Sequence, residues 1–128
     1  MTALAIRARP ATRTLCPNPE HGPGAWQFPL WAAMKEAGRG GLQQQVEAMA
    51  RNLGYECRYH TWNSMHSQGG YPDLHCVGRG RSVFLEMKTV DGKMTPAQER
   101  WRDELIAAGH EYLLVRPCDL SKAEEVLR

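Results

Sequence analysis

The stretch from Gly70 to Lys88 constrains the fold of this chain more than any other part of the sequence. Two short runs rich in apolar residues, 73–77 and 82–88, are separated by Gly-Arg-Gly-Arg at 78–81. Runs of this length are typical of strands, and a glycine-bearing connection of this kind lets two strands lie antiparallel. The sequence therefore predicts a β-hairpin whose first strand begins at Asp73.

Charged residues interrupt the second of these runs. Side chains alternate between the two faces of a strand, so Glu86 and Lys88 share one face, and Val83, Leu85 and Met87 occupy the other. Antiparallel pairing with the preceding strand brings Asp73 to the same region. We expect an aspartate, a glutamate and a lysine to meet at one strand edge.

This combination of side chains suits the hydrolysis of a phosphodiester. The carboxylates of Asp73 and Glu86, with the main-chain carbonyl of Met87 as a further ligand, are the oxygen donors that Mg²⁺ or Mn²⁺ prefers. Such an ion lowers the pKa of a bound water and neutralises charge on the phosphate. Lys88 would orient or help to deprotonate the attacking water, or stabilise the developing negative charge. No organic cofactor is expected.

The same residues carry a resemblance to a known family. Pro72-Asp73 and Glu86-Met87-Lys88 resemble the two motif positions of the PD-(D/E)XK nuclease superfamily. Residues 42–127 further resemble its VRR-NUC branch in five ordered segments: 59–62 (Tyr-His-Thr-Trp), 70–74 (Gly-Tyr-Pro-Asp-Leu), 86–89 (Glu-Met-Lys-Thr), Gln98 with Trp101, and 115–117 (Val-Arg-Pro). The resemblance implies an α/β, restriction-endonuclease-like core, in which helices flank a mixed four-stranded sheet in the order αβββαβ with a C-terminal helix.

Periodicity along the chain agrees with that order. Apolar residues at three- and four-residue steps predict helices over 42–53 and 95–108, each ended by a glycine. The other expected elements are a short helix at 29–37, strands at 55–62 and 111–116, and a last helix through Leu127. Residues 1–41, with many prolines and glycines, are expected to form a flexible arm that includes the short helix, and 42–128 the nuclease-like domain.

The resemblance also implies a contribution from the first helix of that domain. Gln43 would face the site, although glutamine is also an ordinary surface residue of helices. The acid that the family carries near this glutamine has no counterpart at Arg39 or Gly41. Either Glu36 or Glu47 substitutes for it, or the site has one carboxylate fewer.

Three further residues each have a functional and a structural interpretation. Gln98 stands three residues after Thr95, where glutamine completes a capping box, whereas the resemblance places it in the active site; the two roles compete for one side-chain amide. His60 would contact substrate or position the metal site, or it is a structural histidine. Arg116 resembles the arginine of the family's valine-arginine-arginine signature and would contact DNA, although Pro117 in place of the last arginine disfavours a phosphate contact through paired arginines.

DNA is the expected substrate. Side chains that would contact its backbone are Arg79, Arg81, Lys93 and Arg100, with Ser64 from the polar loop 63–71; surface arginines are also ordinary solubilising residues. No base-reading helix is recognisable, so recognition of DNA shape is expected, as in nucleases that cut Holliday junctions or flaps. Symmetric cutting of a four-way junction would suit a homodimer.

Composition bounds the other possibilities. A chain of 128 residues supports one domain, and a formal charge of +2 does not by itself indicate a nucleic-acid binder. The cysteines at 16, 57, 76 and 118 show no spacing typical of a zinc site, and we expect reduced thiols in the cytoplasm of a bacterial or phage-infected cell. No apolar run has the length of a membrane span.

The predicted function is therefore a Mg²⁺- or Mn²⁺-dependent, structure-selective DNA endonuclease. A rival hypothesis is a non-catalytic DNA-binding module that keeps a nuclease fold within a recombination or repair complex, which the missing helix acid would favour. A small-molecule metallohydrolase is disfavoured because no metal-binding pair of histidines is present.

Overall fold

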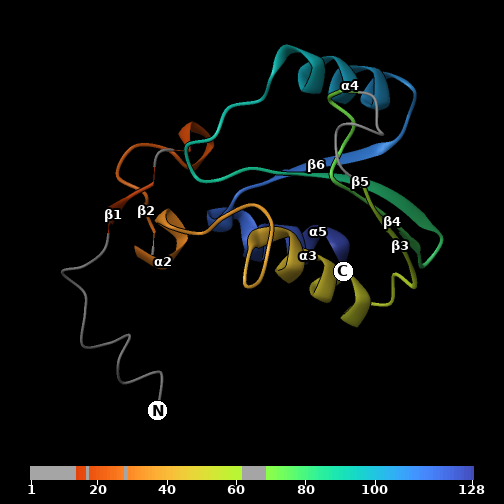
Figure 1. The fold of residues 1–128 in the computed structure, drawn as a ribbon, viewed down its shortest axis with the longest axis horizontal. Helices are drawn as coiled ribbons and strands as arrows, with labels where there is room; N and C mark the ends of the chain where they lie inside the picture. Colours follow the sequence, from red (N-terminus) through yellow and green to blue (C-terminus); the bar gives the residue numbers. More distant parts are fainter. Residues whose placement is uncertain (1–13, 17, 28, 62–68) are drawn as a thin grey trace.

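A four-stranded mixed sheet forms the centre of the molecule (Figure 1). This computed structural model describes residues 14–16, 18–27, 29–61 and 69–128. The strands lie in the order β3 (Cys57–His60), β4 (Leu74–Gly78), β5 (Arg81–Met87) and β6 (Glu111–Val115). The first three pair antiparallel, and β6 runs parallel to β5. The predicted hairpin is confirmed, and its tip, Arg79-Gly80, has the positive φ angles that a tight turn between twisted strands requires.

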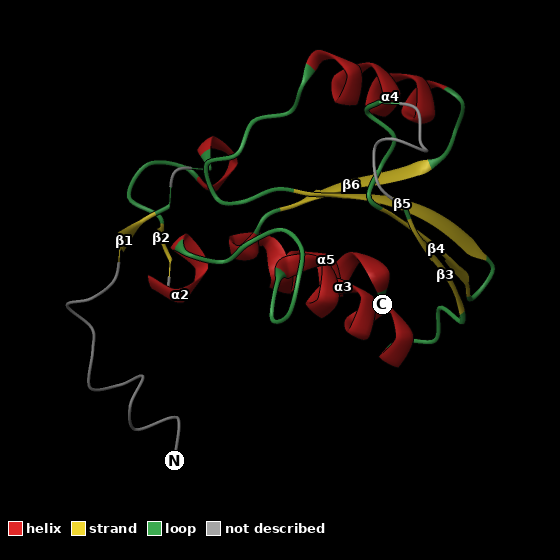
Figure 2. Ribbon diagram, in the orientation of Figure 1, coloured by secondary structure: helices red, strands yellow, loops and turns green. Residues whose placement is uncertain are grey.

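Helices cover both faces of this sheet (Figure 2). Helices α3 (Leu42–Asn52) and α5 (Leu120–Leu127) lie on one face, and α4 (Pro96–Ala107) lies on the other. The predicted fold class is confirmed: an α/β domain with a mixed four-stranded sheet flanked by helices. Within the described ranges, no helix combines the length and the apolar character needed to cross a membrane.

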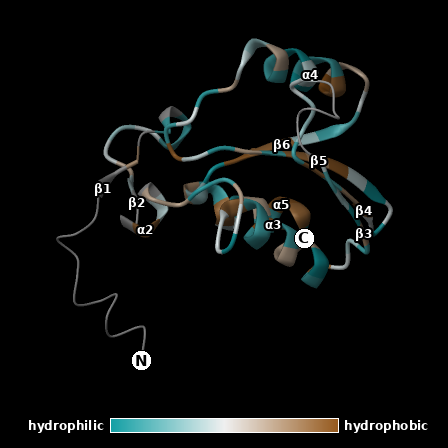
Figure 3. Ribbon diagram, in the orientation of Figure 1, coloured by the Kyte–Doolittle hydropathy of each residue, from teal (hydrophilic) through white to brown (hydrophobic). Residues whose placement is uncertain are grey.

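The main core lies between the sheet and the pair α3 and α5. Its fully buried members include Leu42, Val46 and Ala50 from α3, Val83, Leu85 and Met87 from β5, and Ala123 and Leu127 from α5. Figure 3 shows hydrophobic residues along the neighbouring strands β5 and β6. The alternation predicted for β5 is therefore confirmed, since Val83, Leu85 and Met87 enter this core and Glu86 belongs to the opposite face, which α4 covers.

Helix α2 (Pro29–Ala32) is shorter than the helix predicted at 29–37. The predicted helix does not continue through residue 37, because the chain there bonds to the start of α3. The carbonyls of Lys35 and Glu36 accept hydrogen bonds from Leu42 N and Gln43 N, both at 2.8 Å. Those carbonyls satisfy amides that the first turn of a helix leaves without an intrahelical partner. The segment that precedes α3 is thereby fixed against it.

Strand β3 is also shorter than the predicted 55–62. Tyr55 precedes the strand, is fully buried, and donates its hydroxyl to Leu127 O at 2.8 Å. Its backbone N–H donates to Ala50 O in α3 at 3.0 Å and is therefore not available for sheet pairing. A buried tyrosine needs such a partner for its hydroxyl.

Residues 14–27 hold a small structure that the sequence did not predict. Strand β1 (Thr14–Leu15) pairs antiparallel with β2 (Trp26–Gln27), and the 3-10 helix η2 (Pro19–His21) lies between them. This structure lies beside the body of the domain in Figure 1. Its side chains contact the segment before α5, as described below.

Gly70 fixes the loop that leads to β4 against α4. Its φ is +91°, and a Cβ atom there would lie 2.5 Å from Ala97 C in the first turn of α4. We expect Gly70→Ala to lower the free energy of unfolding by about 2 kcal/mol or more, from backbone strain and steric overlap together. Urea denaturation measures this loss. Gly69→Ala is the matched control, because a Cβ atom at Gly69 meets nothing within 4 Å; equal losses in the two variants would contradict the prediction.

Candidate active site

Asp73 and Glu86 face each other across neighbouring strands. Leu74 pairs with Leu85, so the next step of the antiparallel register places Asp73 opposite Glu86. Side chains directly opposite in such a pair share a face, with Cβ atoms about 5 Å apart. Asp73 Oδ2 also accepts a hydrogen bond from Met87 N at 2.8 Å, which holds this carboxylate at the end of β5. The two acids therefore meet at one strand end, as the sequence predicted.

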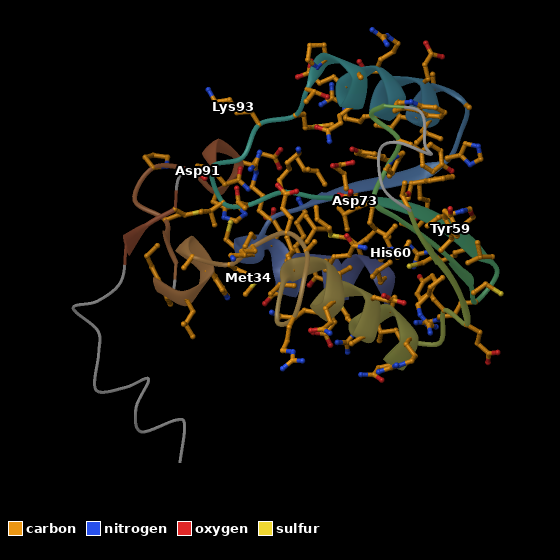
Figure 4. All side chains as sticks on the ribbon, viewed as in Figure 1. Met34, Tyr59, His60, Asp73, Asp91 and Lys93 are labelled. Carbon is orange, nitrogen blue, oxygen red and sulfur yellow. The ribbon has the colours of Figure 1, made fainter. Side chains whose placement is uncertain are left out.

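The backbone of Asp73 is held from the other side by β3. Thr61 N donates to Asp73 O at 2.9 Å, and Thr61 Oγ1 donates to Pro72 O. Figure 4 shows Asp73 just before β4, with His60 on the edge strand close by. His60 pairs with Leu74 in the register and is exposed, so the structure brings it near the acids without placing it among them.

Glu86 is a buried acid with an incomplete set of partners. The residue is 1% exposed, and its Oε1 atom has no hydrogen-bond partner among the described residues. Burial, followed by the charge of the Asp73 carboxylate, raises the pKa of the Glu86 carboxyl to about 9, while the Lys88 ammonium opposes the shift. A buried carboxyl oxygen without a partner is costly, and a bound cation would remove that cost.

Lys88 follows β5 directly and lies in the same place. It is 8% exposed, and its Nζ lies 4.0 Å from Glu86 Oε2. Its backbone N–H donates to Val115 O at 3.0 Å, which extends the pairing of β5 with β6 by one step. The position of Lys88 at the end of β5 therefore places its ammonium beside the two carboxylates.

Gln98 completes the predicted capping box and also contacts one of the two candidate acids. Its Oε1 accepts from Thr95 N at 2.9 Å and completes the capping box at the start of α4. Its Nε2 donates to Glu86 Oε2 at 3.1 Å. Because the two ends of one amide have separate partners, the roles do not compete. The helix cap also aims a donor at Glu86.

The structure separates the two candidates for the helix acid. Glu47 lies 3.7 Å from Arg58 Nε and is paired there. Glu36 is partly buried, and its charge acts on Glu86 by raising the pKa of that carboxyl. Glu36 O accepts from Gln43 N, so the segment that holds Glu36 lies against the first turn of α3, where Gln43 is partly buried.

These donors fit a hard divalent cation. Asp73 and Glu86 would supply carboxylate oxygens and Met87 a main-chain carbonyl, and no donor among the described residues occupies Glu86 Oε1. Mg²⁺ and Mn²⁺ prefer such oxygen ligands. Gln98 and Lys88 contact the other oxygen of Glu86, so they do not occupy Oε1.

Three of the arginines predicted to contact DNA have protein partners. Arg81 pairs with Glu111 through two hydrogen bonds of 3.0 and 2.7 Å. Arg79 donates to Leu53 O and Leu127 O at 3.2 and 3.3 Å. Arg116 Nη1 donates to Thr89 O at 2.7 Å and Gly92 O at 2.6 Å, and so holds the loop that follows Lys88. These contacts give each arginine a structural role.

The remaining predicted DNA contacts lie on the surface or outside the described residues. Lys93, on the loop before α4, and Arg100, on α4, are both exposed; Figure 4 shows the Lys93 side chain projecting from that loop. Ser64 lies outside the described residues.

Tyr112 is a neighbour of the site that the sequence reasoning missed. It pairs with Phe84 in the parallel register of β5 and β6. Burial, and then the charge of Glu86, raises the pKa of its phenol. The available signal was a lone hydroxyl side chain in the otherwise apolar run at 112–115.

Comparisons with known proteins give one structural similarity. No protein-family model matches the sequence, and no curated protein matches it. The structure is similar to a solved structure described as a "VRR_NUC domain protein", with a TM-score of 0.45 and 18% sequence identity, over 66% of this chain and 88% of that chain.

Proposed function

We propose that this protein is a Mg²⁺- or Mn²⁺-dependent endonuclease that hydrolyses phosphodiester bonds in DNA. The observation that carries the proposal is the buried Glu86, opposite Asp73 and 4.0 Å from Lys88 Nζ, with Oε1 lacking a donor among the described residues. An acid pair with a lysine around an unsatisfied oxygen is costly for stability alone. The arrangement is explained if it serves a cation and a phosphate.

The residues of the chain would divide the work as follows. Asp73, Glu86 and the Met87 carbonyl would hold the ion, which when bound lowers the pKa of water and neutralises phosphate charge. Gln98 orients Glu86 through Oε2 and leaves Oε1 free to coordinate. Lys88 Nζ would donate to the attacking water or to the phosphate oxygen that gains charge.

The proposed substrate is branched or flapped DNA, and the proposed assembly is a homodimer. The edge strand β3 exposes His60 and Tyr59 near the acids, and Lys93 is exposed on the loop between Lys88 and α4. An aromatic side chain can stack on an unpaired base, and a lysine can contact the phosphate backbone. Such groups beside the acids favour recognition of DNA structure over recognition of a base sequence.

A cleavage assay tests the proposal. The purified protein is incubated with labelled four-way junction, 5′-flap and plain duplex, in Mg²⁺, Mn²⁺ or EDTA. We expect nicks that require the metal, a preference for the branched substrates, and loss of cutting with retained DNA binding in Asp73→Asn. Asp103→Asn, on the exposed face of α4, is the control and should cut normally. Binding without cutting in every metal would instead support the non-catalytic module.

Glu36 and Glu47 form a matched pair for testing the third acid. Because Glu36 acts electrostatically on Glu86 and Glu47 pairs with Arg58, we expect Glu36→Gln to slow cleavage about tenfold or more, equivalent to ~1.4 kcal/mol. Glu47→Gln should remain within about twofold of the unmodified protein. Single-turnover rates at limiting Mg²⁺ measure both. A larger loss in Glu47→Gln would assign the helix acid to Glu47.

A further inference from the structure

A second group of metal-binding side chains lies away from the acids, where residues 14–27 meet the segment before α5. Cys16 Sγ lies 3.3 Å from Cys118 Sγ and 3.4 Å from His21 Nδ1. The three ligand atoms all lie within 4.8 Å of one another, and both cysteines are free and partly buried. No sequence motif indicates this cluster, because Cys16 and Cys118 are 102 positions apart.

Two of the three separations between these atoms are close to those around a tetrahedral ion with sulfur and nitrogen ligands. Zinc bonds of ~2.3 Å to sulfur and ~2.0 Å to imidazole nitrogen, at tetrahedral angles, separate two sulfurs by about 3.8 Å and a sulfur from a nitrogen by about 3.5 Å. The observed separations of 3.3 and 3.4 Å differ from these by a few tenths of an ångström. Small side-chain rotations would therefore admit an ion.

The ring of His21 is oriented as metal-binding histidines usually are. Its Nε2 lies 2.7 Å from Asp119 Oδ1, so the carboxylate accepts the proton at Nε2 and leaves the Nδ1 lone pair facing Cys16. A carboxylate behind the ligating ring fixes the tautomer and raises the basicity of the ligand. This second observation points to a ligand independently of the cysteines.

Asp119 is itself held rigidly. It is 9% exposed, its Oδ2 accepts from Arg116 N at 3.0 Å, and Asn18 Nδ2 lies 3.5 Å from both of its oxygens. Asn18 is 6% exposed and caps Glu20 N through Oδ1 at 3.0 Å. The histidine is thus braced by a buried polar network, as expected of a built site and not of a chance surface contact.

We propose that Cys16, His21 and Cys118 bind one zinc ion, with Asp119 as the residue that positions His21. Water would complete the four ligands. The thiolates make the site soft, whereas the acid site prefers hard cations, so the two sites select different metals. The ion would cross-link residues 14–27 to the segment 116–119 and stabilise that junction, as structural zinc does in small folds. The proposal does not depend on the nuclease activity.

A disulfide between Cys16 and Cys118 is the competing use of the same sulfurs. Both cysteines are free in this structure, and their sulfurs lie 3.3 Å apart, well beyond the ~2.05 Å of a disulfide bond. The histidine and its carboxylate also have no role in a disulfide.

Cobalt titration of the whole, reduced and metal-free chain tests the site. Co²⁺ bound to thiolates gives a sulfur-to-metal charge-transfer band and intense tetrahedral ligand-field bands, which carboxylate ligands do not give. We expect these bands at about one Co²⁺ per chain, with displacement by Zn²⁺. Zn²⁺ should also raise the melting temperature. Absence of the bands at saturating Co²⁺ would overturn the proposal.

Variants separate this site from the other sulfurs and from the acids. Cys16→Ser and Cys118→Ser should each abolish the charge-transfer spectrum, and His21→Gln should weaken Co²⁺ binding at least tenfold while the thiols remain. Cys57→Ser, which removes an exposed cysteine, and Glu86→Gln should leave the spectrum unchanged.

Bands that survive in Cys16→Ser and His21→Gln would overturn the assignment, as would a chain isolated with Cys16 and Cys118 oxidised to a disulfide and no bound zinc. Cys16 and His21 lie outside the main core. Cys16→Ser and His21→Gln therefore still test the site if Cys118→Ser fails to fold.

Discussion

Glu86→Gln is expected to lower the rate of DNA cleavage in Mg²⁺ by about three orders of magnitude while leaving the metal-free fold intact. An amide cannot supply the negative charge that a divalent cation requires, and the ion is worth several kcal/mol in the transition state. Because the pKa of Glu86 is raised to about 9, the metal-free carboxyl is protonated at neutral pH, and an amide is close to it in shape and charge. Gln98 Nε2 would still find an acceptor on the new side chain. Single-turnover cleavage measures the rate, and thermal unfolding without metal measures the fold.

The sharpest readout is the effect of Mg²⁺ on stability. A ligand that binds only the folded state raises its stability by mass action, so Mg²⁺ should raise the melting temperature of the unmodified protein and not that of Glu86→Gln. Glu104→Gln, an exposed change on α4, is the control and should behave as the unmodified protein. Cleavage by Glu86→Gln within tenfold of the unmodified rate would show that this acid does not hold the metal.

The sheet and the placement of the acids could be predicted because they depend on local patterns. Alternation within 82–88 determines which side chains enter the core, and the Arg79-Gly80 turn sets the register that places Asp73 opposite Glu86. The capping residues Thr95 and Gln98 likewise determine where α4 begins. Each of these interactions joins residues close in the sequence or in adjacent strands.

The remainder depends on contacts between distant segments. The choice between Glu36 and Glu47 rests on how the chain before α3 folds back on that helix, and nothing in the spacing of these residues records it. The cluster of Cys16 with Cys118 joins the two ends of the chain and has no motif. For Gln98, the sequence indicated both a capping role and a place near the acids. It did not indicate that Oε1 could cap the helix while Nε2 contacts Glu86.

The metal-free protein is expected to lose stability as the pH rises from about 4.5 to about 9, and Glu86 is the cause. Its carboxyl has a pKa of 4.5 in the unfolded chain and about 9 in the folded protein, so across this window the unfolded state releases a proton that the folded state keeps. Unfolding then becomes more favourable by up to about 1.4 kcal/mol for each pH unit. Below pH 4.5 the carboxyl is protonated in both states and the contribution is constant.

Comparison with Glu86→Gln isolates this effect from other titrating groups. His75 acts with the opposite sign below pH 6.5, because burial lowers its pKa and the unfolded state binds the extra proton, but its contribution is common to both proteins. Urea unfolding in EDTA should therefore give a steeper fall with pH for the unmodified protein than for the variant. Saturating Mg²⁺ should flatten or reverse that difference, since the ion binds the ionised carboxylate and its affinity rises as the proton is lost. Parallel pH profiles in EDTA would mean that Glu86 is ionised in the metal-free protein, and the cation would then enter a site already charged to receive it.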